Sequence, residues 1–201
     1  KKTLINDNFE CKILQRNEDF LNISHGIEAE MYSPVSIPHD TMIGDAHNFY
    51  SDRIIWYRRK IGVTPSEGNR LFLYFEGVYM DASVYINESL VGKWVNGYTS
   101  FYFEVTDYVK SSEDYIYVSI DYHCPNSRWY AGPGINRDVW LYESSGEHFV
   151  IDSLYVCPKK QDDEKWLINA TVDAILWEIF TNVTFHCDEL NLHEGMIYDK
   201  A

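Results

Sequence analysis

Residues 115–122 read YIYVSIDY, and the apolar residues Ile116, Val118 and Ile120 recur at every second position. Successive side chains of a β-strand point to opposite faces, so this spacing places the three on one buried face of an antiparallel strand. The same alternation occurs at residues 71–76 (LFLYFE), 82–87 (ASVYIN) and 101–105 (FYFEV). We therefore expect at least four half-buried strands.

Clusters of turn-forming residues separate these strands, at 64–69 (TPSEGN), 87–89, 96–100 and 110–114. Two more strands are expected at residues 53–58 (RIIWYR) and 138–142 (DVWLY), and no convincing helical pattern lies between them. Short strands at this spacing are typical of a two-layer β-sandwich. The sequence therefore predicts an all-β fold.

The strand pattern restarts after the polar turn at residues 144–147. Further strands are expected at residues 149–157, 166–174 and 179–186. About fifty residues are too few for a complete sandwich of about 100 residues. We therefore expect a first domain at 1–147 and, at 148–201, a second sandwich that is truncated or closes in an unusual way.

Composition and charge restrict the possible partners. With 201 residues, 45% hydrophobic and 16% aromatic side chains, the chain can bury a sizeable core. Its formal net charge of −14 would repel phosphate backbones and anionic lipids, so we expect neither nucleic acid nor a membrane as a partner. No apolar run approaches the roughly 20 residues of a membrane span.

The four cysteines are widely scattered, at Cys11, Cys124, Cys157 and Cys187. The absence of CxxC spacing argues against a structural zinc site or a redox motif. We expect free, mostly buried thiols in a reducing compartment, and therefore a cytoplasmic location.

Few residues are candidates for catalysis. His123 and Cys124 are neighbours in a strand and would point to opposite faces, so a buried Cys124 is expected rather than a catalytic pair. His39 and Asp40 could supply a general base, but a loop in which Asp40 accepts backbone N–H bonds is favoured. No metal site is expected at two groups of suitable side chains: Asp162, Asp163 and Glu164, and His186, Cys187 and His193. No phosphate-binding loop appears, so no cofactor is expected either.

An irregular segment precedes the strand at 138–142: residues 126–141 read NSRWYAGPGINRDVWL. Gly132 and Gly134 are interpreted as residues that let the backbone turn sharply before the strand. Arg137 and Asp138 are expected to form a structural ion pair. Three aromatic residues upstream are assigned to core or interdomain packing rather than to a sugar-binding strip: Trp94, Tyr98 and Phe101.

Several ordered motifs together resemble the N-terminal sugar-binding domain of family 2 glycoside hydrolases, and within that family bacterial β-galactosidases most. These motifs are FEGVYMDASVYIN (75–87), VGKWVNGYTSFYFEVTDYV (91–109), NSRWYAGPGINRDVWL (126–141), IPHDTMIGDA (37–46) and IIWYRRKI (54–61). The likeness covers residues 1–147 and implies a galactose-binding-like jelly-roll β-sandwich. It identifies 148–201 with the start of the immunoglobulin-like β-sandwich that follows in such enzymes.

The sequence departs from the family pattern at three positions. Thr41 follows Pro38-His39-Asp40 where Trp is frequent, and Asn136 stands where an aromatic residue is common. Glu88 follows Asn87 in a hairpin that usually has Gly, so that turn is expected to be looser or strained.

The resemblance also implies a division of labour. Family members are retaining glycosidases whose two catalytic glutamates, about 5 Å apart, lie on a C-terminal (β/α)₈ barrel. The chain is therefore expected to contain no catalytic residue and to show no glycosidase activity alone. Four residues of the irregular segment would project towards that barrel and bind a β-galactoside: Asn126, Arg128, Trp129 and Tyr130.

Other interpretations of these residues remain open. Trp129 and Tyr130 could instead pack against the barrel, and Arg128 could pair with a carboxylate. The sandwich could also be an autonomous carbohydrate-binding module. A third possibility is a structural module of a β-glucuronidase-like or β-mannosidase-like enzyme that mediates homo-oligomer assembly.

Overall fold

The computed structural model describes residues 1–43, 51–124, 131–162, 165–177, 180–190 and 192–199, without the side chains of 180–182, 190 and 192–199. The chain divides into two compact units, Lys1–Glu143 and Ser144–Ala201. Strands make up 48% of the residues and helices 7%, which confirms the all-β prediction. No helix in the described part of the chain is long and apolar enough to span a membrane.

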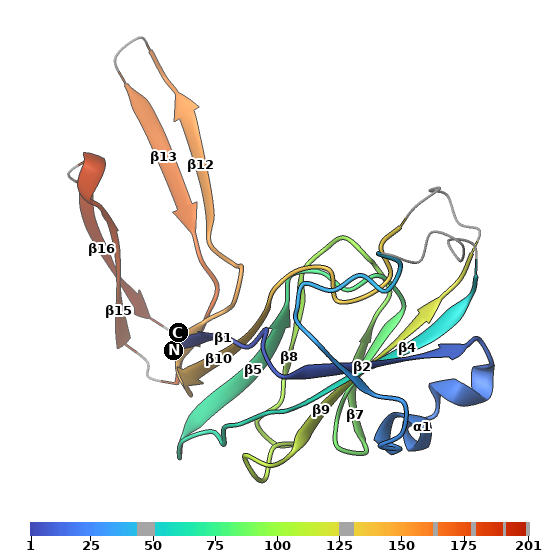
Figure 1. Ribbon diagram of the computed structural model, residues 1–201. Coiled ribbons are helices and arrows are strands. Elements are labelled where there is room, and N and C mark those ends of the chain that lie inside the picture. Colours follow the sequence, from blue (N-terminus) through green and yellow to red (C-terminus); the bar gives the residue numbers. More distant parts are fainter. Residues whose placement is uncertain (44–50, 125–130, 163–164, 178–179, 191, 200–201) are drawn as a thin grey trace. The chain divides into compact units, whose positions relative to one another are not determined.

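The first unit is a sandwich of two antiparallel sheets (Figure 1). The four-stranded sheet has the order β1-β10-β5-β8, and the six-stranded sheet has the order β3-β2-β4-β9-β6-β7. The strands are β1 (Lys2–Leu4), β2 (Phe9–Gln15), β3 (Ser33–Val35), β4 (Arg53–Lys60), β5 (Asn69–Phe75), β6 (Ala82–Ile86), β7 (Ser89–Trp94), β8 (Phe101–Glu104), β9 (Tyr115–Tyr122) and β10 (Val139–Ser145).

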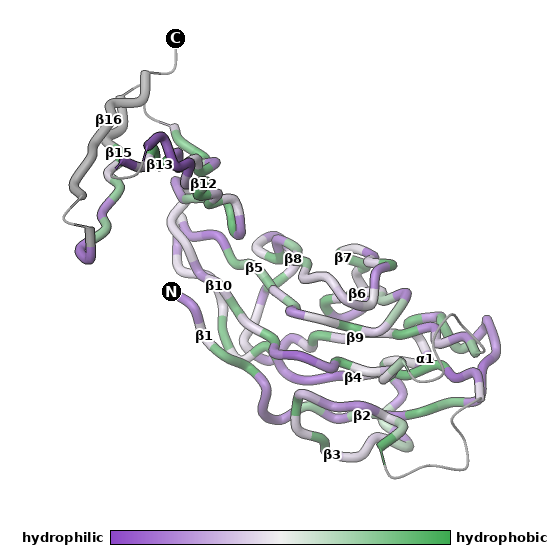
Figure 2. The backbone as a smooth tube through the Cα atoms, turned by 90° about the horizontal axis from the view of Figure 1, so that it is seen from above, coloured by the Kyte–Doolittle hydropathy of each residue, from purple (hydrophilic) through white to green (hydrophobic). Residues whose placement is uncertain are grey.

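The core lies between the two sheets and follows the alternation expected from the sequence. Ile116, Val118 and Ile120 of β9 are each 0% exposed, as the YIYVSIDY pattern predicts. They meet residues of the opposite sheet, among them Leu73 and Val139, which are also 0% exposed. Apolar and polar stretches alternate along these strands, as Figure 2 shows.

The outer face of the six-stranded sheet is partly covered by a helical segment that the sequence pattern did not predict. It consists of the 3₁₀ helix η1 (Glu18–Leu21) and the helix α1 (Ile23–Ile27). Trp56 is buried beneath it and donates its indole N–H to the carbonyl of Phe20 at 2.8 Å. Gly26 is required at this contact, because a Cβ there would lie 2.6 Å from the Trp56 ring. Elements this short show too little of the 3.6-residue period to be recognised.

The hairpin between β6 and β7 is irregular, as expected from the missing glycine. Asn87 has a φ of +50°, and the register between the strands shifts at Val84 and Tyr85. The Asn87 side chain accepts a hydrogen bond from the Tyr115 backbone N–H at 2.9 Å, which ties the turn to the beginning of β9.

The second unit consists of three antiparallel strand pairs: β11 with β14, β12 with β13, and β15 with β16. Its elements are β11 (His148–Phe149), β12 (Tyr155–Lys160), β13 (Trp166–Thr171), β14 (Ala174–Ile175), β15 (Phe180–Cys187), η2 (Asp188–Leu190) and β16 (Leu192–Asp199). The expected strands at 149–157 and 166–174 are thus each divided in two. Large side chains such as Tyr155 and Trp166 are 64% and 60% exposed.

All four cysteines are free, as predicted, but the expectation that they are mostly buried is wrong. Only Cys11, on the core face of β2, is buried, whereas Cys157 on β12 is exposed. Burial raises the pKa of the Cys11 thiol to about 12. The β12–β13 pair buries little side-chain surface, which is why its cysteine is accessible.

Candidate functional site

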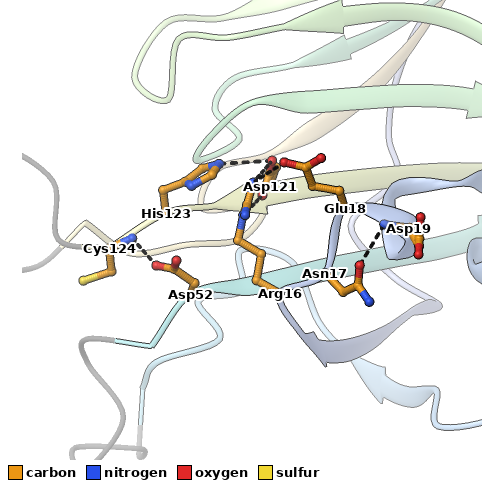
Figure 3. Close-up of polar contacts among 8 residues, drawn as sticks. All are labelled: Arg16, Asn17, Glu18, Asp19, Asp52, Asp121, His123 and Cys124. Carbon is orange, nitrogen blue, oxygen red and sulfur yellow. Dashed lines mark hydrogen bonds and ion pairs between the residues drawn. The ribbon is translucent and has the colours of Figure 1, made fainter.

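The candidate site lies at the end of the first sandwich where β4 begins and β9 ends. In the register of these strands Arg53 is opposite Tyr122, so residues just outside both strands are neighbours. The backbone N–H of Cys124 donates to a carboxylate oxygen of Asp52 at 2.5 Å (Figure 3). This bond fixes the residues that immediately follow segment 44–50 beside those that immediately precede segment 125–130.

A charged cluster stands next to this bond, on the outer face of β9. Arg16 donates from Nε and Nη2 to the two carboxylate oxygens of Asp121, at 2.9 and 3.3 Å. His123 Nε2 lies 3.1 Å from the same carboxylate (Figure 3). The hydrogen bond that Arg16 donates to Asp121 raises the pKa of the Arg16 guanidinium. Arg16 follows the last residue of β2, so the cluster connects the ends of two strands in one sheet.

The segment at residues 37–43 forms another part of the site. His39 Nδ1 is 2.7 Å from the Tyr57 hydroxyl, and burial lowers the pKa of His39, against the opposing effect of Asp40. Asp40 accepts the backbone N–H of Met42 at 2.8 Å. This contact confirms the structural role expected for Asp40, and the lowered pKa favours neutral His39 at pH 7.

The backbone that follows segment 125–130 is held by two other segments. Thr41 donates from its backbone N–H and its hydroxyl to the Pro133 carbonyl, both at 2.9 Å. Tyr79 and Gly134 exchange backbone hydrogen bonds at 2.9 and 3.1 Å. Gly134 has a φ of +151°, and a Cβ there would lie 2.2 Å from the His39 carbonyl oxygen. The interpretation of Gly134 as a residue required by the backbone is confirmed.

Aromatic side chains line the same end. Tyr79 and Tyr122 belong to one buried cluster, with ring centroids 6.2 Å apart. Tyr98 packs edge-on against Tyr79 at 5.3 Å but is 52% exposed. Trp94 and Phe101 stack at 5.4 Å against the core, as the core assignment expects, whereas Tyr98 lies outside the core.

The four sugar-binding residues predicted from the sequence, Asn126, Arg128, Trp129 and Tyr130, lie outside the described residues, and their role stays a prediction. Their flanking residues are well anchored, as the contacts of Cys124 and Pro133 show. The expected buried Cys124 is instead partly exposed.

The ion pair expected between Arg137 and Asp138 is not formed. Arg137 donates to the Tyr98 carbonyl at 3.3 Å, and Asp138 accepts from the Asn6 amide at 2.8 Å. Neighbouring residues at the beginning of a strand diverge, which separates the two charges.

Sequence reasoning missed the cluster formed by Arg16, Asp121 and His123. One signal was present: positions 121 and 123 differ by two residues, which places both side chains on the same strand face. Arg16 is 105 residues from Asp121, and no local pattern links them. Among the described residues, no group of three or more His, Cys, Asp or Glu side chains could hold a metal ion. The cluster and the aromatic rings together offer hydrogen-bond acceptors and apolar faces, which suit a hydroxyl-rich ligand.

Comparison with known proteins finds similarity to the same family that the sequence motifs resemble. Residues 38–131 match the family model of the glycosyl hydrolase 2 galactose-binding domain-like domain. A β-galactosidase of Bacteroides ovatus is 35% identical over 144 residues, which cover 70% of this chain and 17% of that protein. A β-glucuronidase of Bacteroides fragilis is 35% identical over 107 residues, covering 50% of this chain and 15% of that protein.

Solved structures share the fold. A family 2 glycosyl hydrolase of Bacteroides cellulosilyticus superimposes with a TM-score of 0.79 at 22% identity, over 98% of this chain and 28% of that chain. The chain thus spans about a fifth of the length of the curated relatives that it matches. It belongs to the family 2 glycosyl hydrolases, and residues 38–131 form the galactose-binding-like domain of that family.

Proposed function

We propose that this chain is the non-catalytic N-terminal part of a retaining enzyme that hydrolyses terminal β-galactosides. In this proposal the first sandwich orients a C-terminal catalytic barrel and contributes a few contacts to the sugar. The proposal is supported by the family membership and by the similarity to a β-galactosidase over 70% of the chain. The anchored backbone on both sides of segment 125–130 also supports it, because a contact residue must be held in place to contribute binding energy.

The charge at this end of the sandwich is the observation that favours a galactoside over a glucuronide. A glucuronide carries a carboxylate, whereas a galactoside is neutral. Asp40, Asp52 and Asp121 all stand at this end, and the Arg16 guanidinium already binds Asp121. Arg53 is buried and donates to Ser51 and to a backbone carbonyl. Among the described residues, an anionic sugar would meet these carboxylates, and the guanidinium groups of Arg16 and Arg53 are already bound within the protein.

The test of substrate class uses the enzyme that carries this chain and two chromogenic substrates, 4-nitrophenyl β-galactoside and 4-nitrophenyl β-glucuronide. We expect a larger kcat/KM for the galactoside. A larger kcat/KM for the glucuronide would contradict the proposed substrate.

The test of the contact role is the Arg128→Ala variant of the same enzyme. Loss of a hydrogen bond to the substrate should lower kcat/KM about tenfold, because such a bond contributes roughly 1–3 kcal/mol when its partner is left unpaired. Arg70→Ala is the matched control, because Arg70 lies on β5 and pairs with Glu104 at 2.7 Å. Unchanged kcat/KM in Arg128→Ala would show that the residue only packs.

A further inference from the structure

A concave surface lies on the outer face of the six-stranded sheet, beside the helical segment that covers Trp56. It is a groove of about 290 Å³ between strands β6, β7 and β9 and the last residue of η1, Leu21. Ligand pockets in proteins commonly measure roughly 300–1,000 Å³, so this groove lies at the lower limit of that range and could hold no more than about one sugar ring.

The strand register explains why polar side chains gather in this groove. Ser83 on β6 is opposite Lys93 on β7 and Ser119 on β9. Since Ala82 and Val84 point into the core, the intervening Ser83 points outward, towards the groove. The groove is therefore built on three neighbouring strands rather than on loops.

Tyr85 supplies a fixed aromatic ring in the groove. Its ring packs against buried Trp56, with centroids 5.9 Å apart. Burial raises the pKa of its hydroxyl, against the opposing effect of Ser83 and Ser119, which keeps the hydroxyl protonated at pH 7. An aromatic ring held in this way loses little conformational entropy when a ligand packs against it. Leu21 and Val95 add apolar surface to the groove.

Charged groups of both signs complete the lining. Asp81 and Asp121 provide carboxylate acceptors, and Lys93 provides an exposed ammonium donor. Burial, and then the nearby Asp121 charge, raise the pKa of Asp81. Arg16 neutralises most of the Asp121 charge by its two hydrogen bonds. The groove thus presents acceptors and a donor with little net positive charge, which suits hydroxyl groups better than an anion.

We propose that this groove is a binding site for one neutral pyranoside ring, which packs against Tyr85 and hydrogen-bonds to Asp81 and Lys93. Neither the family match nor the relatives' names assign a ligand to these residues. The groove is shallow and open to water, so the affinity is in the millimolar range, with Kd of about 1 mM.

The test measures binding to the 201-residue chain by two-dimensional NMR titration, with two probes that differ only at C6. Methyl β-galactopyranoside is neutral, and methyl β-galacturonide carries a carboxylate. We expect the neutral probe to shift the amide signals of β6 and β7, and to bind at least about fivefold more tightly than the anionic probe. No shift at these strands, or tighter binding of the galacturonide, would overturn the proposal.

Two variants separate this groove from other surfaces. Asp81→Asn removes a charge and retains the backbone, because Asn tolerates the positive φ of +50° found there. Lys93→Met removes the donor but keeps the length of the side chain. We expect each to weaken binding of the neutral probe about tenfold, and Lys110→Met, on a different exposed turn, to leave it unchanged.

The outcomes also separate this site from the proposed role of the sandwich in a β-galactoside-hydrolysing enzyme. Wild-type affinity in both groove variants would refute the site, whatever the enzyme's substrate is. Tenfold weaker binding in both, with unchanged amide spectra elsewhere in the first unit, would support it.

Discussion

At the scale of single residues, the backbone between Ala131 and Asp138 depends on one glycine. Gly134 combines a φ of +151°, which side chains rarely allow, with a carbonyl oxygen where a Cβ would stand. Its N–H and carbonyl also pair with Tyr79, which connects this backbone to the loop before β6. Gly134 thus links both the His39 segment and the loop before β6 to the candidate site.

We expect Gly134→Ala to lower the free energy of unfolding by at least about 2 kcal/mol. Two costs are combined there, because the new side chain would strain the backbone at this φ and would displace the His39 carbonyl. Gly62→Ala is the matched control: its φ is +77°, but no atom lies within 4 Å of the new Cβ. It should cost only about 1 kcal/mol of backbone strain. Urea denaturation measures both, and equal effects would contradict the importance of the close approach.

At the scale of secondary-structure elements, Glu143 fastens β10 to the turn that precedes β5. Its carboxylate accepts the backbone N–H of Ser66 and the side-chain amide of Asn69, both at 3.0 Å. These hydrogen bonds, that of Asn69 first, lower the pKa of Glu143 from 4.5 to about 2. The charged form is therefore favoured in the folded state.

A carboxyl whose pKa is lowered on folding stabilises the protein above its unfolded pKa, and this contribution is lost as pH falls through its folded pKa. We expect the Tm of the wild type to exceed that of Glu143→Gln at pH 7. The difference should shrink between pH 4.5 and about 2. Glu67→Gln, an exposed position of the same turn, is the control. Calorimetry at several pH values measures this, and a constant difference would refute the role of the charge.

Two elements show which parts of the fold a local sequence pattern can predict and which it cannot. The strand at residues 115–122 was predicted with its bounds, because Ile116, Val118 and Ile120 alternate strictly and all belong to the core between the sheets. The helical cover at η1 and α1 was missed, because the burial of Trp56, not a helical period, determines its position. The position of such elements depends on contacts between residues that are distant in the sequence, and a local sequence pattern cannot reveal those contacts.

At the scale of the whole molecule, the first unit contains a core of its own. Its two sheets and their buried residues all lie before Ser144, apart from the end of β10. The second unit is built from three separate strand pairs with many exposed apolar side chains. The two units should therefore differ greatly in stability.

We expect residues 1–147 alone to fold and to unfold in one cooperative transition, with a Tm within about 5 °C of the main transition of the full chain. Residues 148–201 alone should show little cooperativity, because isolated two-stranded pairs are marginal in water. Circular dichroism on both fragments measures this. Loss of cooperative unfolding in 1–147 would show that its core requires the second unit.

The sequence by itself determined the all-β class, the main strands and the family, because alternation and turn residues act over a few positions. It also indicated that Asp40 and Gly134 have structural roles. Only the tertiary structure brought Arg16 to Asp121, placed Asp52 beside Cys124 and arranged Tyr85, Lys93 and Asp81 around one groove. These residues lie far apart along the chain or on different strands, and their proximity depends on the strand order and register, which no local pattern encodes.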